Sequence, residues 1–139
     1  MAEKIHLSVV TPERVVIDMD VDRVEIPGLG GELGILPGHT ELISQLKLAG
    51  LLTYHTGEDK GEISISDGFV EVSRDRVEVL ADRAERPEDI DLSRALEIKE
   101  RAEHQIQKAM TDPDIDIARA TADLERAVIE VQLAEKARR

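Results

Sequence analysis

The pattern of hydrophobic and polar residues changes its period along the chain. Up to about residue 80, apolar and polar residues alternate in short runs, for example at residues 5–9, 21–26 and 76–80. A period of two predicts β-strands that bury one face. Many such runs, with no room between them for crossover helices, indicate an antiparallel sandwich or barrel. We expect a two-layer sandwich.

Turn residues separate these runs. Asp67-Gly68 stands between the runs at residues 62–65 and 69–72 and predicts a two-residue hairpin, because Gly tolerates the positive φ of a type I′ turn. Residues 31–39 read as a strand followed by a Pro-Gly turn with a histidine at its end. Such a loop is stiff, which suits a contact with another protein.

Beyond Pro87 the apolar positions follow a helical period on two successive segments. They are Leu92, Ala95, Ala102, Ile106 and Ala109 on the first segment, and Ile117, Ala120, Leu124, Ala127, Val128 and Val131 on the second. Pro113 lies in the short break between them and cannot donate a hydrogen bond inside a helix. Two helices with so short a connection form an antiparallel hairpin. Because alanine seams bury little area, we expect this hairpin to depend on further contacts and to be movable.

Composition places the boundary between the two parts. All nine glycines lie between Gly28 and Gly68, and across Pro87 the valines fall from ten to two while the alanines rise from four to nine. Glycine and β-branched residues favour turns and strands, whereas alanine favours helix. The predicted domains are therefore a β-sandwich over residues 1–86 and a two-helix antiparallel hairpin over residues 87–139.

Charge and residue types exclude several classes of function. A net charge of −12 argues against a nucleic-acid binder, and the longest apolar stretch is far below the roughly 20 residues of a membrane span. The chain has no cysteine, and its four histidines show no paired spacing, so we expect no metal site and no catalytic triad. No nucleophile or cofactor motif is visible, which favours a protein that is not an enzyme.

Two motifs imitate ligand-binding loops. The glycines of residues 28–34 invite a phosphate-loop interpretation, but Leu33 stands where a dinucleotide fingerprint requires glycine. Asp18, Asp20 and Asp22 imitate the start of a calcium loop, but Arg23 occupies the position that requires glycine. We expect neither site.

A seven-residue motif occurs twice. Residues 89–95, Asp-Ile-Asp-Leu-Ser-Arg-Ala, recur as residues 114–120, Asp-Ile-Asp-Ile-Ala-Arg-Ala. One interpretation is a shared helix start, with the aspartates capping free amide groups at the positive end of the helix dipole. The other is a contact with a ligand, and the repeat by itself is compatible with both.

Taken together, these motifs resemble the epsilon subunit of bacterial F-type ATP synthases. The most specific parts are residues 31–39, 66–72, 79–82 and 90–95, and the resemblance covers nearly all 139 residues. It implies a non-catalytic rotor subunit of the central stalk, peripheral on the cytoplasmic face of the bacterial inner membrane. It also implies three partners: the gamma subunit, the c-ring and the catalytic beta subunits.

The resemblance assigns contacts to particular residues. Glu32 and His39 would face the c-ring, although Thr40-Glu41 follows where relatives usually have Ala-Pro. The C-terminal helices would inhibit ATP hydrolysis by reaching the catalytic head. The implied contacts of the second helix are basic: Arg119, Arg126, Lys136, Arg138 and Arg139. A solvated helix face explains the same residues equally well.

Some members of this family bind a regulatory ATP at the start of the first helix. The residues that would form this site here are Glu85, Ile90, Asp91, Arg94, Ala95, Arg101 and Arg126. Glu130 stands where strong binders carry a basic residue, which removes a phosphate contact. An alternative function is therefore an ATP-sensing module whose hairpin closes on nucleotide.

Overall fold

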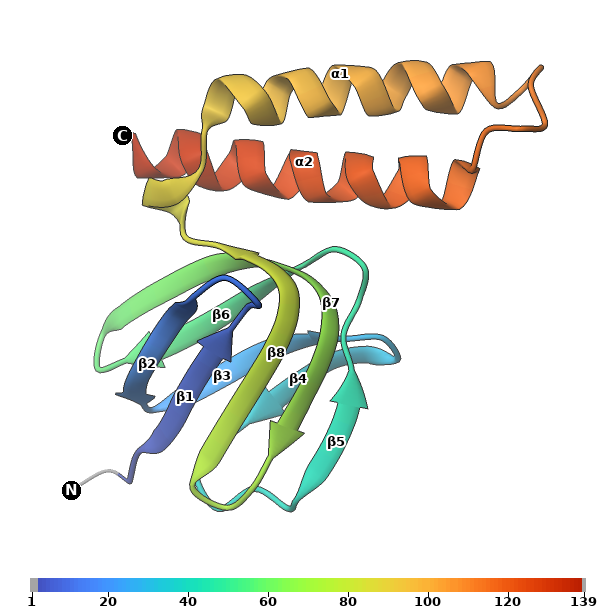
Figure 1. Cartoon of the computed structure of the whole chain (residues 1–139). Helices are drawn as coiled ribbons and strands as arrows, with labels where there is room; N and C mark the ends of the chain where they lie inside the picture. Colours follow the sequence, from blue (N-terminus) through green and yellow to red (C-terminus); the bar gives the residue numbers. More distant parts are fainter. Residues whose placement is uncertain (1–2, 139) are drawn as a thin grey trace. The chain divides into compact units, whose positions relative to one another are not determined.

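The computed structural model describes residues 3–138, and the chain divides into two compact units between Arg86 and Pro87. The first unit is a β-sandwich and the second a helical hairpin, which confirms the expected fold class (Figure 1). The strands are β1 Ile5–Val10, β2 Val15–Val21, β3 Arg23–Gly28, β4 Gly31–Ile35, β5 Leu42–Gln45, β6 Gly50–Thr56, β7 Asp59–Val72 and β8 Arg76–Glu85. The helices are η1 Pro87–Asp89, α1 Leu92–Lys108 and α2 Ile117–Ala137.

The strands follow the order β2-β1-β8-β7-β6-β3-β4, and β5 pairs with β7. Every pair is antiparallel except β1 with β8, which run parallel, with His6 opposite Arg76 and Val10 opposite Leu80. These two strands come from opposite ends of the unit, so no hairpin fixes their relative direction. The sheet is therefore not purely antiparallel.

The hairpin predicted at Asp67-Gly68 is wrong, because β7 continues through this dipeptide without a chain reversal. Asp67 and Gly68 have φ of 56° and 124°, but Ser66 and Gly68 pair with β8 in one continuous register. The first part of β7 also pairs with β6 and the last part with β5. The positive φ values thus bend one long strand between the two layers, and the chain reverses instead at Gly57, where φ is 62°.

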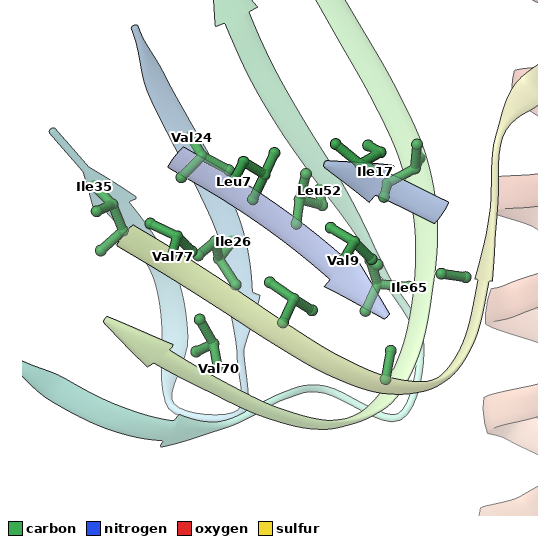
Figure 2. Close-up of a cluster of buried hydrophobic side chains, with 14 of the residues drawn as sticks. Leu7, Val9, Ile17, Val24, Ile26, Ile35, Leu52, Ile65, Val70 and Val77 are labelled. Carbon is green, nitrogen blue, oxygen red and sulfur yellow. The ribbon is translucent and has the colours of Figure 1, made fainter. Parts of the chain in front are cut away.

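The sandwich core is aliphatic, as the scarcity of aromatic residues requires. Leu7, Leu52 and Ile65 are fully buried, and Figure 2 shows them among other aliphatic side chains that point between the layers. The inward residues alternate with polar or exposed ones along β1, β7 and β8. All members of this core belong to the first unit, so the sandwich has a hydrophobic core of its own.

The helical unit consists of two antiparallel helices that pack along each other (Figure 1). Ala95 and Ala102 of α1 are buried, as are Ala120 and Ala127 of α2, which confirms the predicted alanine seams. Small side chains let two helices approach closely but bury little apolar area. No helix within residues 3–138 has the length and apolar character needed to cross a membrane.

Candidate functional site

A row of apolar side chains crosses the outer face of the sandwich on four neighbouring strands. Val15 lies opposite Val10, Val10 opposite Leu80, and Leu80 opposite Phe69. We call these four residues the Phe69 row. Ile43 on β5 lies diagonal to Phe69, since Gln45 is the direct partner of Phe69 and alternate residues share a face. Ile43 therefore continues the apolar surface of the Phe69 row onto a fifth strand.

Four of these side chains are exposed although they are large and apolar, and Val10 is half-buried. The exposed fraction is 55% for Phe69, 49% for Leu80, 60% for Val15 and 74% for Ile43. A contiguous exposed apolar patch is a candidate interaction surface. The row was not predicted from the sequence, although alternation signals it: Val70 and Val79 point inward, so their neighbours Phe69 and Leu80 must point outward.

Charged residues border the Phe69 row. Glu71 lies opposite both Ile43 and Glu78, and the Arg76 guanidinium lies 3.7 Å from the Glu78 carboxylate. An apolar centre with a polar rim is the usual anatomy of a protein interface.

Glu32 and His39 do not lie on one loop. Glu32 is exposed near the start of β4, opposite Pro27, whereas His39 lies beyond the end of this strand. The predicted Pro-Gly turn precedes His39: Gly38 has φ of 83° and the His39 amide donates to the Leu36 carbonyl at 3.1 Å. At about 3.3 Å per residue, the strand alone separates the two positions by roughly 10 Å.

The repeated motif provides the N-caps of both helices. The Asp91 carboxylate accepts from the Arg94 amide at 3.2 Å, and the Asp116 carboxylate accepts from the Arg119 amide at 3.1 Å. Both aspartates have extended backbone, as N-cap residues do. This geometry accounts for the aspartate before each helix, and it leaves both arginine side chains exposed.

The structure distributes the residues implied in ATP binding over both units. Arg94 and Arg101 are exposed and lie seven residues apart on α1, hence on the same side of this helix. Ile90 is half-buried and Ala95 is buried. Arg126 on α2 is half-buried, with a guanidinium nitrogen 3.8 Å from Asp123.

Glu85 belongs to the sandwich unit. It is the last residue of β8, and its carboxylate lies 3.4 Å from the Arg14 guanidinium. Within the sandwich, Thr11, Glu13, Arg14 and residues 82–85 line a hollow of about 150 Å³. This volume is below the roughly 300 Å³ of small-molecule sites, so we do not assign a nucleotide to it.

The basic residues of α2 are not one cluster. Arg119 is exposed near the start of the helix, Lys136 is exposed in its last turn, and Arg138 is the C-cap residue. Arg126 lies between them, and Arg139 lies outside the residues that the structure describes. Cations in the last turn also stabilise a helix through its dipole, whatever else they contact.

The three aspartates that imitate a calcium loop form hydrogen bonds with side chains of the N-terminal segment instead. Asp18 and Asp20 both hydrogen-bond the His6 ring, the latter at 2.8 Å, and Asp22 accepts from Lys4 at 2.5 Å. The hydrogen bonds from Asp20 and then Asp18 raise the pKa of His6 above 6.5. Its hydrogen bonds with Lys4 and the Gly57 amide lower the pKa of Asp22.

Comparison with known proteins gives matches over nearly the whole chain. Residues 4–87 match the model of the beta-sandwich domain of the ATP synthase delta/epsilon chain, and residues 88–135 match its long alpha-helix domain. The ATP synthase epsilon chain of Desulfosudis oleivorans is 46% identical over 107 residues, 77% of this chain and 80% of the relative. That of Carboxydothermus hydrogenoformans is 48% identical over 108 residues, 78% of this chain and 80% of the relative.

Solved structures agree with the fold. A chain in the cryo-EM structure of the Euglena gracilis mitochondrial ATP synthase, OSCP/F1/c-ring, superposes with a TM-score of 0.75 and 24% identity, over 98% of this chain and 82% of that one. A chain in the Tetrahymena thermophila mitochondrial ATP synthase central stalk/c-ring gives 0.56 and 16%, over 97% and 96%. The two family models and the curated relatives show that the chain belongs to the ATP synthase delta/epsilon chain family, as a non-catalytic subunit.

Proposed function

We propose that the chain is a rotor subunit of the central stalk, which couples the catalytic head to the c-ring and restrains ATP hydrolysis through its helices. The Phe69 row is the observation that carries this proposal, because it gives the sandwich an apolar surface for a protein partner. The gamma subunit is that partner. The chain is then held peripherally at the cytoplasmic face of the bacterial inner membrane through the complex alone.

Binding to gamma tests this surface. Phe69→Ser or Leu80→Ser removes a large side chain from the centre of the row and should weaken binding at least tenfold, as loss of a central aromatic or aliphatic contact does. Leu36→Ser is the matched control, since Leu36 is 59% exposed but lies outside the row. The measurement is the affinity of each folded variant for a gamma-containing catalytic head. If all three variants bind like the wild type, gamma does not use this face.

The proposed c-ring contact involves Glu32 and His39 separately, because Glu32 lies near the start of β4 and His39 lies beyond its end. The chain has no cysteine, so Glu32→Cys and His39→Cys each introduce a single site for cross-linking. In the assembled complex, we expect each variant to cross-link to the c-ring. Asp59→Cys, at the β6–β7 turn, is the control. If a variant gives no more cross-linked product with the c-ring than Asp59→Cys does, that position does not contact the c-ring.

Inhibition is tested by removing the helices. A chain that ends at Arg86 retains the entire sandwich core, so it should fold and still bind gamma. Added to a gamma-containing head, the full chain should slow ATP hydrolysis and the shortened chain should not. Equal hydrolysis with both would contradict the inhibitory role.

The basic residues of α2 are the proposed contacts with the catalytic beta subunits. Arg119 and Arg138 are exposed, so their charges are accessible to a partner. Replacing both with Gln should weaken inhibition and reduce its sensitivity to salt, because exposed charge pairs are screened by ions. Inhibition that keeps the wild-type salt dependence would leave these residues as a solvated face.

A second candidate function is ATP sensing by the helical unit. The observation that favours it is the presence of two exposed arginines, Arg94 and Arg101, on one side of α1. Guanidinium groups bind phosphate oxygens in a bidentate manner. Titration of the isolated chain with ATP separates this function from the rotor function, because no other subunit is then present.

A further inference from the structure

Strand β2 contains a β-bulge whose extra residue is Val16. Ile17 pairs with Val9 and Val15 pairs with Val10, so Val16 has no partner on β1. The side chains of Val16 and Ile17 are consecutive and both buried in the hydrophobic core, whereas successive side chains of a regular strand point to opposite faces. A bulge interrupts the ladder, so the backbone groups of Val16 need another partner.

Arg86 supplies that partner from the far end of the unit. Its guanidinium donates to the Val16 carbonyl twice, through Nε at 2.9 Å and through Nη2. Glu85, whose side chain projects to the opposite side of the strand, forms the ion pair with Arg14. The last two residues of the sandwich unit are therefore held on both sides by the same short segment, residues 14–16.

The chain beyond Arg86 belongs to the other unit. The 3-10 turn Pro87–Asp89 packs against α2, and the Ile90 amide donates to the Pro87 carbonyl at 3.3 Å. Proline fixes its own φ and restricts the preceding residue to extended conformations. The proline thus limits its own φ and the backbone conformations of Arg86 at the boundary between the units.

We propose that Arg86 is the anchor of the joint between the two units. By donating hydrogen bonds to the Val16 carbonyl at the bulge, Arg86 keeps β8 paired to its last residue. Any movement of the helical unit then pivots at the Arg86-Pro87 link. The tertiary amide of the Arg86-Pro87 bond and the anchored Arg86 side chain confine this pivot to a few backbone bonds. The inference concerns the isolated chain and holds whether or not the helices inhibit hydrolysis.

Amide hydrogen exchange of the full-length chain tests the anchor. Arg86→Gln removes the charged guanidinium group. In this variant the amides of residues 84–86 should exchange at least about tenfold faster, while those of residues 77–79 in the middle of β8 keep the wild-type rate. Arg86→Lys retains the charge and a single donor group and should give an intermediate rate. Arg74→Gln removes an exposed arginine from the β7–β8 turn and should change neither segment.

Backbone relaxation of the wild-type chain supplies the second measurement. The backbone amides of residues 84–86 should have the relaxation rates of the sandwich strands, and those of residues 88–90 should have the relaxation rates of α2. The proposal is overturned if residues 84–86 are already mobile in the wild type. It is also overturned if Arg86→Gln leaves their exchange unchanged or accelerates residues 77–79 equally, because the arginine would then not act locally.

Discussion

The backbone of Gly68 lies against the carbonyl group of Leu80 on the neighbouring strand. A Cβ at residue 68 would lie 2.0 Å from the Leu80 oxygen and 2.9 Å from the Ala81 Cα, and Gly68 also has φ of 124°. Only glycine satisfies both conditions. This contact holds β7 against β8 at the bend of β7, next to Phe69 and Leu80 of the exposed row.

Gly68→Ala should therefore destabilise the sandwich by at least about 2 kcal/mol, because both the clash and the positive φ involve backbone atoms that cannot move aside. Gly34→Ala is the control: a Cβ at residue 34 of β4 would meet no heavy atom within 4 Å, so this variant should change the free energy of unfolding by no more than about 0.5 kcal/mol. Urea unfolding of both variants measures the difference. Similar values for the two would contradict the role given to the Leu80 contact.

The two N-caps should contribute comparably to the helical unit. Asp91→Ala and Asp116→Ala each remove a side-chain acceptor for a helix amide and should cost about 1 kcal/mol. Asp91→Asn retains an acceptor and should cost only a few tenths of a kcal/mol. Unfolding followed by helical circular dichroism gives these values. Equal losses for Asn and Ala at position 91 would show that charge, and not capping, is the important property of Asp91.

Stability should depend on pH through His6. The hydrogen bonds from Asp20 and Asp18 raise its pKa in the folded chain above 6.5, so the charged form is favoured by folding. The stabilisation is complete below about pH 6.5 and is lost as the pH rises through the folded-state pKa. Desolvation of the ring, which disfavours its charged form, limits this gain.

His6→Gln removes the titrating group while keeping a polar side chain. The difference in unfolding free energy between wild type and variant should be below about 1 kcal/mol at pH 6 and smaller still at pH 9, because the groups are partly exposed. Asp20→Asn should reduce the same pH dependence. A difference that is constant from pH 6 to pH 9 would rule out protonated His6 as its source.

ATP binding can be tested with a control that the repeat provides. Arg94 and Arg119 occupy the same position after the caps of α1 and α2. If ATP binds at the start of α1, Arg94→Ala should lower the affinity of the isolated chain at least tenfold, whereas Arg119→Ala should not. Calorimetric titration measures both. No saturable binding at millimolar ATP, or equal losses in the two variants, would remove this site.

The sequence by itself determined the helical unit and the boundary between the units. Leu92–Lys108 and Ile117–Ala137 were predictable because helix formation depends on nearby residues: an alanine stripe with a helical period, an aspartate cap and a proline break. The aliphatic, inward-facing positions of the strands were predictable for the same reason, since alternation is local. Of the candidate residues, the arginines of α1 and α2 could be placed on their helices in this way.

Only the tertiary structure decided how the strands are used. Asp67-Gly68 has the local chemistry of a hairpin, yet β8 pairs on both sides of it and turns it into a bend. Strand β5 has no alternating pattern, because Leu42 and Ile43 are both apolar, and it forms through its pairing with β7. The parallel contact of β1 with β8 joins residues about seventy positions apart.

About seventy positions also separate Val10 from Leu80 in the Phe69 row, and Val16 from Arg86 at the joint. Leu80 lies opposite Val10 only through strand pairing, and the Arg86 guanidinium reaches Val16 only because a bulge frees a carbonyl there. Such contacts depend on strand register and on which hydrogen-bond partners are available to each backbone group. A local sequence pattern encodes neither. The chain therefore carries its helices and its boundary in local sequence, and its interaction face and its joint in long-range pairing.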